Sequence, residues 1–114
     1  MARSPIPDPL RRRLDLERDL DPRRAMTLAE AYLSEGRTLE AVAFLHKADA
    51  RERLEQLLDE AVKKGDLFLA REVSQALGAP LSRDRCRALA VAAAAQGKDR
   101  YAQEARRLAE RLGE

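Results

Sequence analysis

Residues 28–48 read LAEAYLSEGRTLEAVAFLHKA, and this stretch indicates two helices joined by a short turn. Leu28, Ala29 and Tyr32 share one face of the first helix at helical spacing. Gly36 stands just after that helix, where a residue with left-handed backbone geometry commonly ends a helix. Ala41 in the second helix is small enough to let the two helices cross closely. The stretch therefore predicts an antiparallel helical hairpin.

Similar signals recur along the chain. Helical patterns end at isolated glycines, namely Gly36, Gly65, Gly78, Gly97 and Gly113. Polar residues that cap helices precede the next patterns, at Thr38, Asp49, Asp66, Ser82 and Asp99. Asp49 and Glu52 also have the spacing of a capping box. The predicted helices span about 22–34, 38–47, 50–64, 67–77, 83–96 and 99–112. No stretch alternates as a strand would, so no sheet is expected.

The N-terminal region differs from the rest. Residues 1–8 are predicted to be an irregular lead-in, because Pro5 and Pro7 prevent a helix. Asp8 and Pro9 then suit the cap and the first position of a helix that runs to about Leu20, with Leu10 turned inward. We expect a single domain over residues 9–114, with hairpins at about 22–47, 50–77 and 83–112.

The three hairpins align when Gly36, Gly65 and Gly97 are superposed. Eight residues before each glycine stands a leucine, at Leu28, Leu57 and Leu89. Five residues after each glycine stands an alanine, at Ala41, Ala70 and Ala102. Each hairpin leaves one apolar face uncovered, so the units must stack to bury it.

This spacing resembles the tetratricopeptide repeat. The fullest match lies in the first hairpin, at Leu28, Ala29, Tyr32, Gly36, Thr38, Ala41, Leu45 and Ala48. The second copy has Ala61 in the aromatic position, and the third has Arg106 in a large apolar position. The resemblance implies an all-α fold of antiparallel αα-hairpins stacked as a short right-handed superhelix, with about three hairpins plus an N-terminal helix. A helical bundle with chance periodicity, or another array of αα-hairpins, is the alternative interpretation.

The charge of the chain gives little support to nucleic-acid binding. The formal net charge is +2 over 114 residues. The excess comes from residues 1–24, which hold seven arginines and five acids. Nucleic-acid binding usually needs a concentrated basic face. Arg11, Arg12, Arg13, Arg18, Arg23 and Arg24 provide that alternative, but Asp15, Glu17, Asp19 and Asp21 are interleaved with them.

No residue pattern indicates catalysis, a metal or a cofactor. His46 is the single histidine and suits the end of a helix, where it faces the dipole favourably. Cys86 is the single cysteine, so no intrachain disulfide forms. Its place in the first turn of a helix would suit a reactive thiol, although a packed side chain is the simpler interpretation. We expect no enzyme, no bound metal or cofactor, no membrane span and a cytoplasmic location.

The resemblance also implies a concave groove lined by the first helix of each hairpin. The residues it places there are Met26, Glu30, Leu33, Glu52, Glu55, Asp59, Val62, Arg87 and Val91. The middle of the groove is acidic, and Val62, Val91, Ala94 and Ala95 form an apolar floor. This combination favours a basic amphipathic segment as ligand. The other interpretation is that these acids only keep the surface soluble.

The helix over 83–96 contains the apolar run Ala88–Ala95. We expect it to be buried on all sides, and the alternative is one exposed side that serves as a dimer or ligand patch.

Taken together, the predicted hairpins and the predicted groove favour an adaptor or scaffold that binds another protein. The alternatives are a nucleic-acid-binding module that uses the N-terminal arginines, and an oligomerising structural subunit, for which a homodimer is the simplest form.

Overall fold

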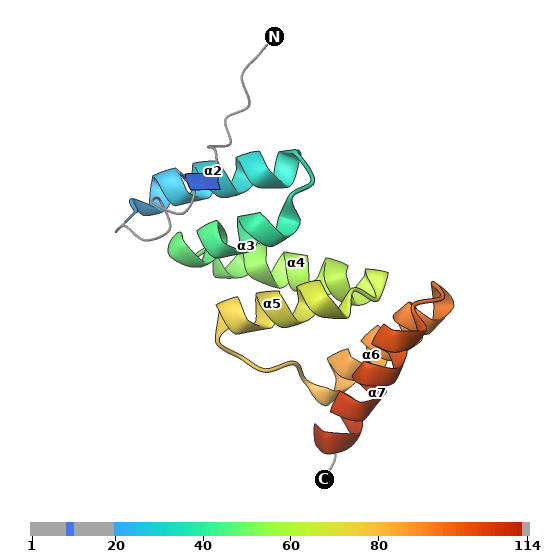
Figure 1. The fold of residues 1–114 in the computed structure, drawn as a ribbon. Helices are drawn as coiled ribbons and strands as arrows, with labels where there is room; N and C mark the ends of the chain where they lie inside the picture. Colours follow the sequence, from blue (N-terminus) through green and yellow to red (C-terminus); the bar gives the residue numbers. More distant parts are fainter. Residues whose placement is uncertain (1–8, 11–19, 113–114) are drawn as a thin grey trace. The chain divides into compact units, whose positions relative to one another are not determined.

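A computed structural model describes residues 9–10 and 20–112, and it is helical with no strand among those residues (Figure 1). The helices are α2 (Pro22–Ser34), α3 (Thr38–Lys47), α4 (Arg51–Lys64), α5 (Leu67–Leu77), α6 (Arg83–Ala95) and α7 (Asp99–Leu112). Each of the six helices predicted over 22–112 is confirmed to within one residue at each end. The all-α class is confirmed as well.

The predicted N-terminal elements fall largely outside the described residues. The lead-in over 1–8, most of the helix over 9–20 and Gly113 all lie there. Pro9 and Leu10 are described and are helical. The side chain of Leu10 is 68% exposed, so its predicted inward position is wrong.

Contacts between Cα atoms group the chain into two compact units, Met1–Leu54 and Glu55–Glu114. We call these the N-terminal unit and the C-terminal unit. Their boundary falls within α4, so the first turn of this helix belongs to one unit and the remainder to the other. The predicted single domain stays a prediction.

The core of the N-terminal unit forms between α2 and α3. Ala25, Leu28, Ala29 and Tyr32 from α2 are buried together with Ala41, Val42, Phe44 and Leu45 from α3. The rings of Tyr32 and Phe44 stack with centroids 5.2 Å apart and planes inclined by 14°. Such a pair contributes about 0.5–1.5 kcal/mol beyond its buried area. The aromatic contact therefore adds to the apolar burial that holds the predicted hairpin together.

Arg37 closes the turn of this hairpin. Its guanidinium carbon lies 5.0 Å from the centroid of the Tyr32 ring, a cation–π arrangement. The same guanidinium forms an ion pair with Glu40 in the first turn of α3. The hydrogen bond to Glu40 raises the pKa of Arg37 above its ordinary value. Arg37 therefore stays charged while it links the turn to both helices.

The core of the C-terminal unit is built mainly from leucine, valine and alanine. Its buried members are Leu57, Leu58, Ala61, Leu67, Ala70, Val73, Leu81, Cys86, Leu89, Ala90, Ala93, Ala102, Ala105 and Ala109. The helices α6 and α7 pack side by side along their length (Figure 1). Five of the buried residues in this helix pair are alanines, namely Ala90, Ala93, Ala102, Ala105 and Ala109, and small side chains let helix backbones approach closely.

Five of the six helices end in the same type of turn. In each, a backbone N–H donates to the carbonyl five residues earlier, which satisfies one of the last carbonyls of the helix. These bonds run from Arg37 to Tyr32, Ala50 to Leu45, Asp66 to Ala61, Ala79 to Ser74 and Lys98 to Ala93, at N–O distances of 2.8–3.1 Å. The predicted helix ends at Gly36, Gly65, Gly78 and Gly97 follow from these turns.

Asp49 occupies the left-handed position of the α3 turn, with φ 53°. The predicted capping box of Asp49 with Glu52 is therefore wrong, because α4 begins two residues later, at Arg51. Aspartate is among the few residues besides glycine that visit this backbone region. Asp49 thus does for α3 what a glycine does for α2, α4, α5 and α6.

The other predicted caps divide into two groups. The side chain of Asp66 accepts a hydrogen bond from the N–H of Leu69, and that of Ser82 accepts one from the N–H of Arg85. Both of these caps are confirmed. Thr38 and Asp99 are the first residues of their helices rather than caps, so those two predictions are wrong by one position.

Gly65 lies against the backbone of α6. A Cβ atom at this position would lie 2.5 Å from the nitrogen and 2.6 Å from the Cα of Ala93. The ammonium of Lys98 also donates a hydrogen bond to the carbonyl of Lys64 at 3.0 Å. The end of α4 and the end of α6 are therefore in direct contact, and no side chain fits between them.

We predict that Gly65→Ala destabilises the protein more than Gly97→Ala. Both glycines have positive φ, +67° and +73°, so both substitutions lose about 1–2 kcal/mol to backbone strain. Only Gly65→Ala must also displace α6, which adds about 1–3 kcal/mol as overpacking does. Chemical denaturation of the two variants measures the difference. Equal losses would contradict the close contact.

Asp49→Gly is expected to stabilise the protein by up to about 1 kcal/mol, because glycine adopts the left-handed region without a Cβ penalty. Asp49→Ala is the control and should lower stability, since alanine keeps the penalty and loses the tolerance of aspartate. Thermal melting of both variants checks the prediction. A loss of stability in Asp49→Gly would contradict it.

Candidate functional site

The nine predicted groove residues lie on three helices, and none of them is buried. Met26, Glu30 and Leu33 are on α2, Glu52, Glu55, Asp59 and Val62 on α4, and Arg87 and Val91 on α6. Met26, Leu33 and Val62 are half-buried and the other six are exposed. Four of the nine belong to the N-terminal unit and five to the C-terminal unit. That they share one groove stays a prediction.

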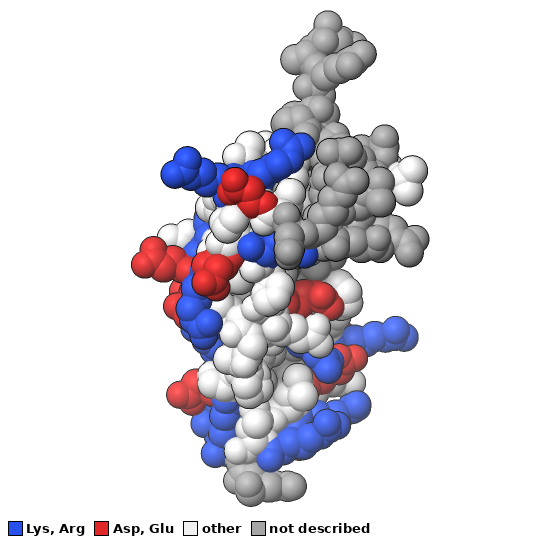
Figure 2. Space-filling model, turned by 90° about the vertical axis from the view of Figure 1, so that its left-hand side faces the viewer, with Lys and Arg blue, Asp and Glu red and all other residues white. Residues whose placement is uncertain are grey.

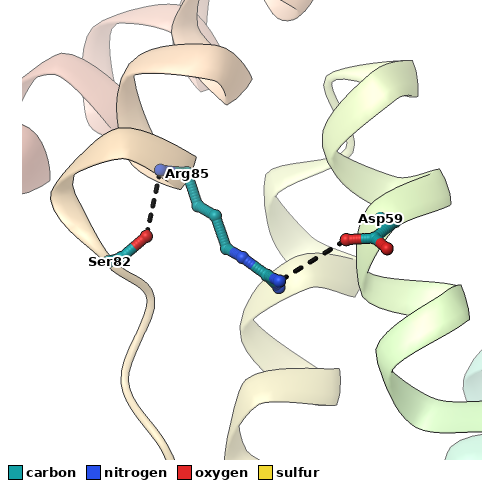
Figure 3. A network of polar contacts seen from close by, with 3 residues as sticks. All are labelled: Asp59, Ser82 and Arg85. Carbon is teal, nitrogen blue, oxygen red and sulfur yellow. Dashed lines mark hydrogen bonds and ion pairs between the residues drawn. The ribbon is translucent and has the colours of Figure 1, made fainter. Parts of the chain in front are cut away.

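Two of the predicted acids face arginines. In the N-terminal unit, a carboxylate oxygen of Glu30 lies 3.4 Å from Nε of Arg53 in the first turn of α4. In the C-terminal unit, a carboxylate oxygen of Asp59 lies 3.4 Å from a guanidinium nitrogen of Arg85 on α6 (Figure 3). The backbone N–H of the same Arg85 donates to Ser82, so the helix cap and the ion pair share one residue.

These two ion pairs occupy the same position in the predicted repeat. Glu30 and Asp59 each stand six residues before the glycine of their hairpin. Arg53 and Arg85 each stand twelve residues before the glycine of the following hairpin. One pair joins α2 to α4 and the other joins α4 to α6, which are the first helices of successive predicted hairpins. We call these two contacts the ion-pair series.

The ion-pair series changes the charge expected for the groove. Arg53 and Arg85 were not among the predicted site residues, although their equal spacing from Gly65 and Gly97 was a usable signal. Glu30 and Asp59 each face a guanidinium, and the acids Glu52 and Glu55 are exposed on α4. Each pair is partly exposed and contributes about 0–1 kcal/mol to stability. The two ion pairs therefore affect the surface charge of the protein more than its stability.

The apolar helix α6 is not buried on all sides, so that prediction is wrong. Leu89, Ala90 and Ala93 are buried, whereas Ala88, Ala94 and Ala95 are exposed. Val91 is the largest apolar side chain on the exposed side and is 72% exposed. The alternative of one exposed apolar side describes the structure.

An open cleft of about 390 Å³ lies between α6 and α7. It is lined by Arg83, Arg87, Ala90, Val91, Arg106, Ala109 and Glu110. Its floor is apolar and its rim is mainly basic. Two of the predicted groove residues, Arg87 and Val91, therefore belong to a cleft that sequence reasoning did not locate. The residues of α7 that complete it become neighbours of α6 only in the folded hairpin.

Cys86 is fully buried at the edge of a second cleft of about 260 Å³, formed by α5, the following loop, α6 and α7. Burial raises the pKa of the Cys86 thiol, and the positive charge of Arg71 offsets this in part. The burial agrees with the packed side chain that the sequence favoured over a reactive thiol, because the site lowers both access and the thiolate population.

We predict that Cys86 reacts slowly with a disulfide reagent in the native protein at pH 8, and rapidly once the protein is unfolded in denaturant. The raised pKa keeps the buried group as a thiol, and its burial requires opening of the C-terminal unit before reaction. Gly65→Ala should increase the native rate because it weakens this unit. A wild-type rate equal to that of the unfolded chain would contradict the burial.

His46 lies in the last turn of α3, as predicted for a helix-terminal histidine. In the described ranges 9–10 and 20–112, no group of three histidine, cysteine or acidic side chains is placed to hold a metal ion. No helix within those ranges is long and apolar enough to span a membrane. No family model, curated protein or solved structure matches the chain.

Proposed function

We propose that the chain is a tetratricopeptide-like adaptor of the cytoplasm that binds a segment of another protein along the first helices of its hairpins. The observation that carries the proposal is the ion-pair series, in which equivalent residues of successive hairpins make the same contact. A bundle with chance periodicity has no reason to repeat a tertiary contact at one register. The role is binding rather than catalysis.

The contacts within the C-terminal unit support a stacked arrangement of hairpins. Asp59 of α4 faces Arg85 of α6, and six residues further along α4 the backbone at Gly65 touches Ala93 of α6. The two contacts advance together along both helices, so α4 and α6 run in the same direction. The first helices of neighbouring hairpins have this relation in a repeat array. The inference to a short superhelix is part of the proposal.

The exposed carboxylates of α4 support a basic ligand at this helix. Glu52 and Glu55 are both exposed, and Val62 adds a half-buried apolar side chain two turns further along. Complementary charge speeds association and orients a ligand, while apolar burial supplies most of the affinity. A basic amphipathic segment fits this combination. On the face drawn in Figure 2, acidic and basic side chains are mixed, which does not favour a phosphate backbone as ligand.

We predict that Glu52→Arg/Glu55→Arg loses a protein partner that wild type retains in a pull-down from cell lysate. Reversal of two exposed charges repels a basic ligand without disturbing the core or either contact of the ion-pair series. The matched control is Glu60→Arg/Glu104→Arg, which makes the same change of charge at exposed positions outside the predicted groove. All three proteins must first show equal helicity and equal melting temperature.

The outcomes separate the proposed adaptor from its alternatives. Loss of a partner in the groove variant alone supports the adaptor. Equal retention by all three proteins removes the role of α4. Recovery of nucleic acid alone, with a steep loss on added salt, favours the arginine-rich N-terminal segment instead. A mass that rises with concentration favours the oligomerising subunit.

A further inference from the structure

The ion-pair series stops at α6. Glu30 and Asp59 stand six residues before their glycines, and each faces an arginine of the next hairpin. Val91 holds the same position before Gly97, and its side chain is 72% exposed. The position that receives a neighbouring helix in the first two hairpins is therefore apolar and uncovered in the third.

The cleft beside Val91 has an apolar floor. Ala90 and Ala109, 5% and 6% exposed, form this floor between α6 and α7. Val91 forms one wall and leaves most of its surface to solvent. A large apolar side chain of a ligand would cover Val91 and the two alanines together. The volume of about 390 Å³ is sufficient for such a side chain.

The rim of the cleft is strongly basic. Arg83 and Arg87 are four residues apart and so lie on one face of α6, while Arg106 faces them from α7. All three are exposed, and no acidic side chain in the described part of the chain forms an ion pair with any of them. Glu110 is the single acid of the cleft. The rim therefore presents a surplus of positive charge around an apolar floor.

We propose that this cleft binds a helical segment of a partner protein that places one large apolar side chain against Val91 and carboxylates beside Arg83, Arg87 and Arg106. Charge complementarity selects an acidic segment, and the apolar floor selects a protein over a phosphate backbone. A helix is the expected form because α6 itself covers the equivalent position of α4, with Arg85 against Asp59. The ligand is thus opposite in charge to the one proposed for α4, so this site goes beyond the adaptor groove.

The test uses two synthetic peptides with a fluorescent label. One is an alanine-based helix of about 18 residues with leucines on one face flanked by glutamates, long enough to be partly helical in water. Its twin has lysines in place of the glutamates. Fluorescence anisotropy with full-length protein measures both dissociation constants. We expect wild type to bind the acidic peptide at least about tenfold more tightly than the basic one.

Two variants and a matched control locate the site. Val91→Asp and Arg83→Glu/Arg106→Glu should each raise the dissociation constant of the acidic peptide by at least about tenfold. Arg100→Glu/Arg107→Glu makes the same change of charge at exposed positions of α7 outside this cleft. This control should bind the acidic peptide with a dissociation constant within about twofold of the wild-type value. Arg83→Glu/Arg106→Glu should also gain affinity for the basic peptide, a result that unfolding cannot produce. Circular dichroism and melting verify that all variants are folded.

Several outcomes would overturn the proposal. They are no binding of the acidic peptide by wild type, equal binding of both peptides, or an equal loss in the Arg100→Glu/Arg107→Glu control. A wild-type dimer that Val91→Asp converts to monomer would make a second copy of the chain the occupant instead. The Glu52→Arg/Glu55→Arg variant should still bind the acidic peptide, so failure of the α4 groove and failure of this cleft are distinguishable.

Discussion

The contact between Gly65 and the backbone of Ala93 is the constraint on which the C-terminal unit depends. The end of α4 reaches α6 without an intervening side chain, and the left-handed turn at Gly65 requires the same absence of a Cβ. Lys98 then donates to the last carbonyl of α4, so the crossing is polar as well as close. This crossing determines which residues of α6 lie against α4. Arg85 is brought to Asp59, and the side that bears Val91 is left in solvent.

The exposed surfaces of the neighbouring helices α4 and α6 differ in charge. In α4 the exposed surface includes Glu52 and Glu55, whereas the uncovered side of α6 carries Arg83 and Arg87 around Val91. The ion pairs between consecutive first helices use one acid of α2 and one of α4, so they reduce the negative surface without removing it. Weak, partly exposed pairs of this kind contribute little to stability. They do change the local charge beside each acid, and differences in local charge are one means by which proteins discriminate between ligands.

The sequence was sufficient for the helices and insufficient for the contacts between them. Helix ends were predictable because the residues after them act locally: Gly36 and Gly65 adopt left-handed geometry, and Asp66 and Ser82 cap the next helix. Asp49 was misassigned because aspartate can serve as an N-cap or as a residue in the left-handed region. Only the backbone conformation in the folded protein shows which of the two roles it has. Arg85 and Arg106 were missed because their partners and neighbours come from other helices. The preferred interpretation of Cys86 as a packed side chain agrees with its burial among α5, α6 and α7, which outweighs its place in the first turn of α6.

Exposure alone would not make Val91 informative, because single apolar side chains are common on protein surfaces. Its value comes from comparison with Glu30 and Asp59, the residues at the same position in the other hairpins. Each of those positions is occupied by a charged side chain that meets the next helix, and a solvent-facing end of the array would be served equally well by another charge. The third position instead holds an uncharged valine beside three arginines, and no described acid forms an ion pair with these arginines. The site therefore combines exposed apolar surface with positive charge. Apolar area supplies affinity, and unneutralised charge supplies selectivity. The third hairpin therefore differs from the first two in the manner expected of a surface that receives a helix from another protein.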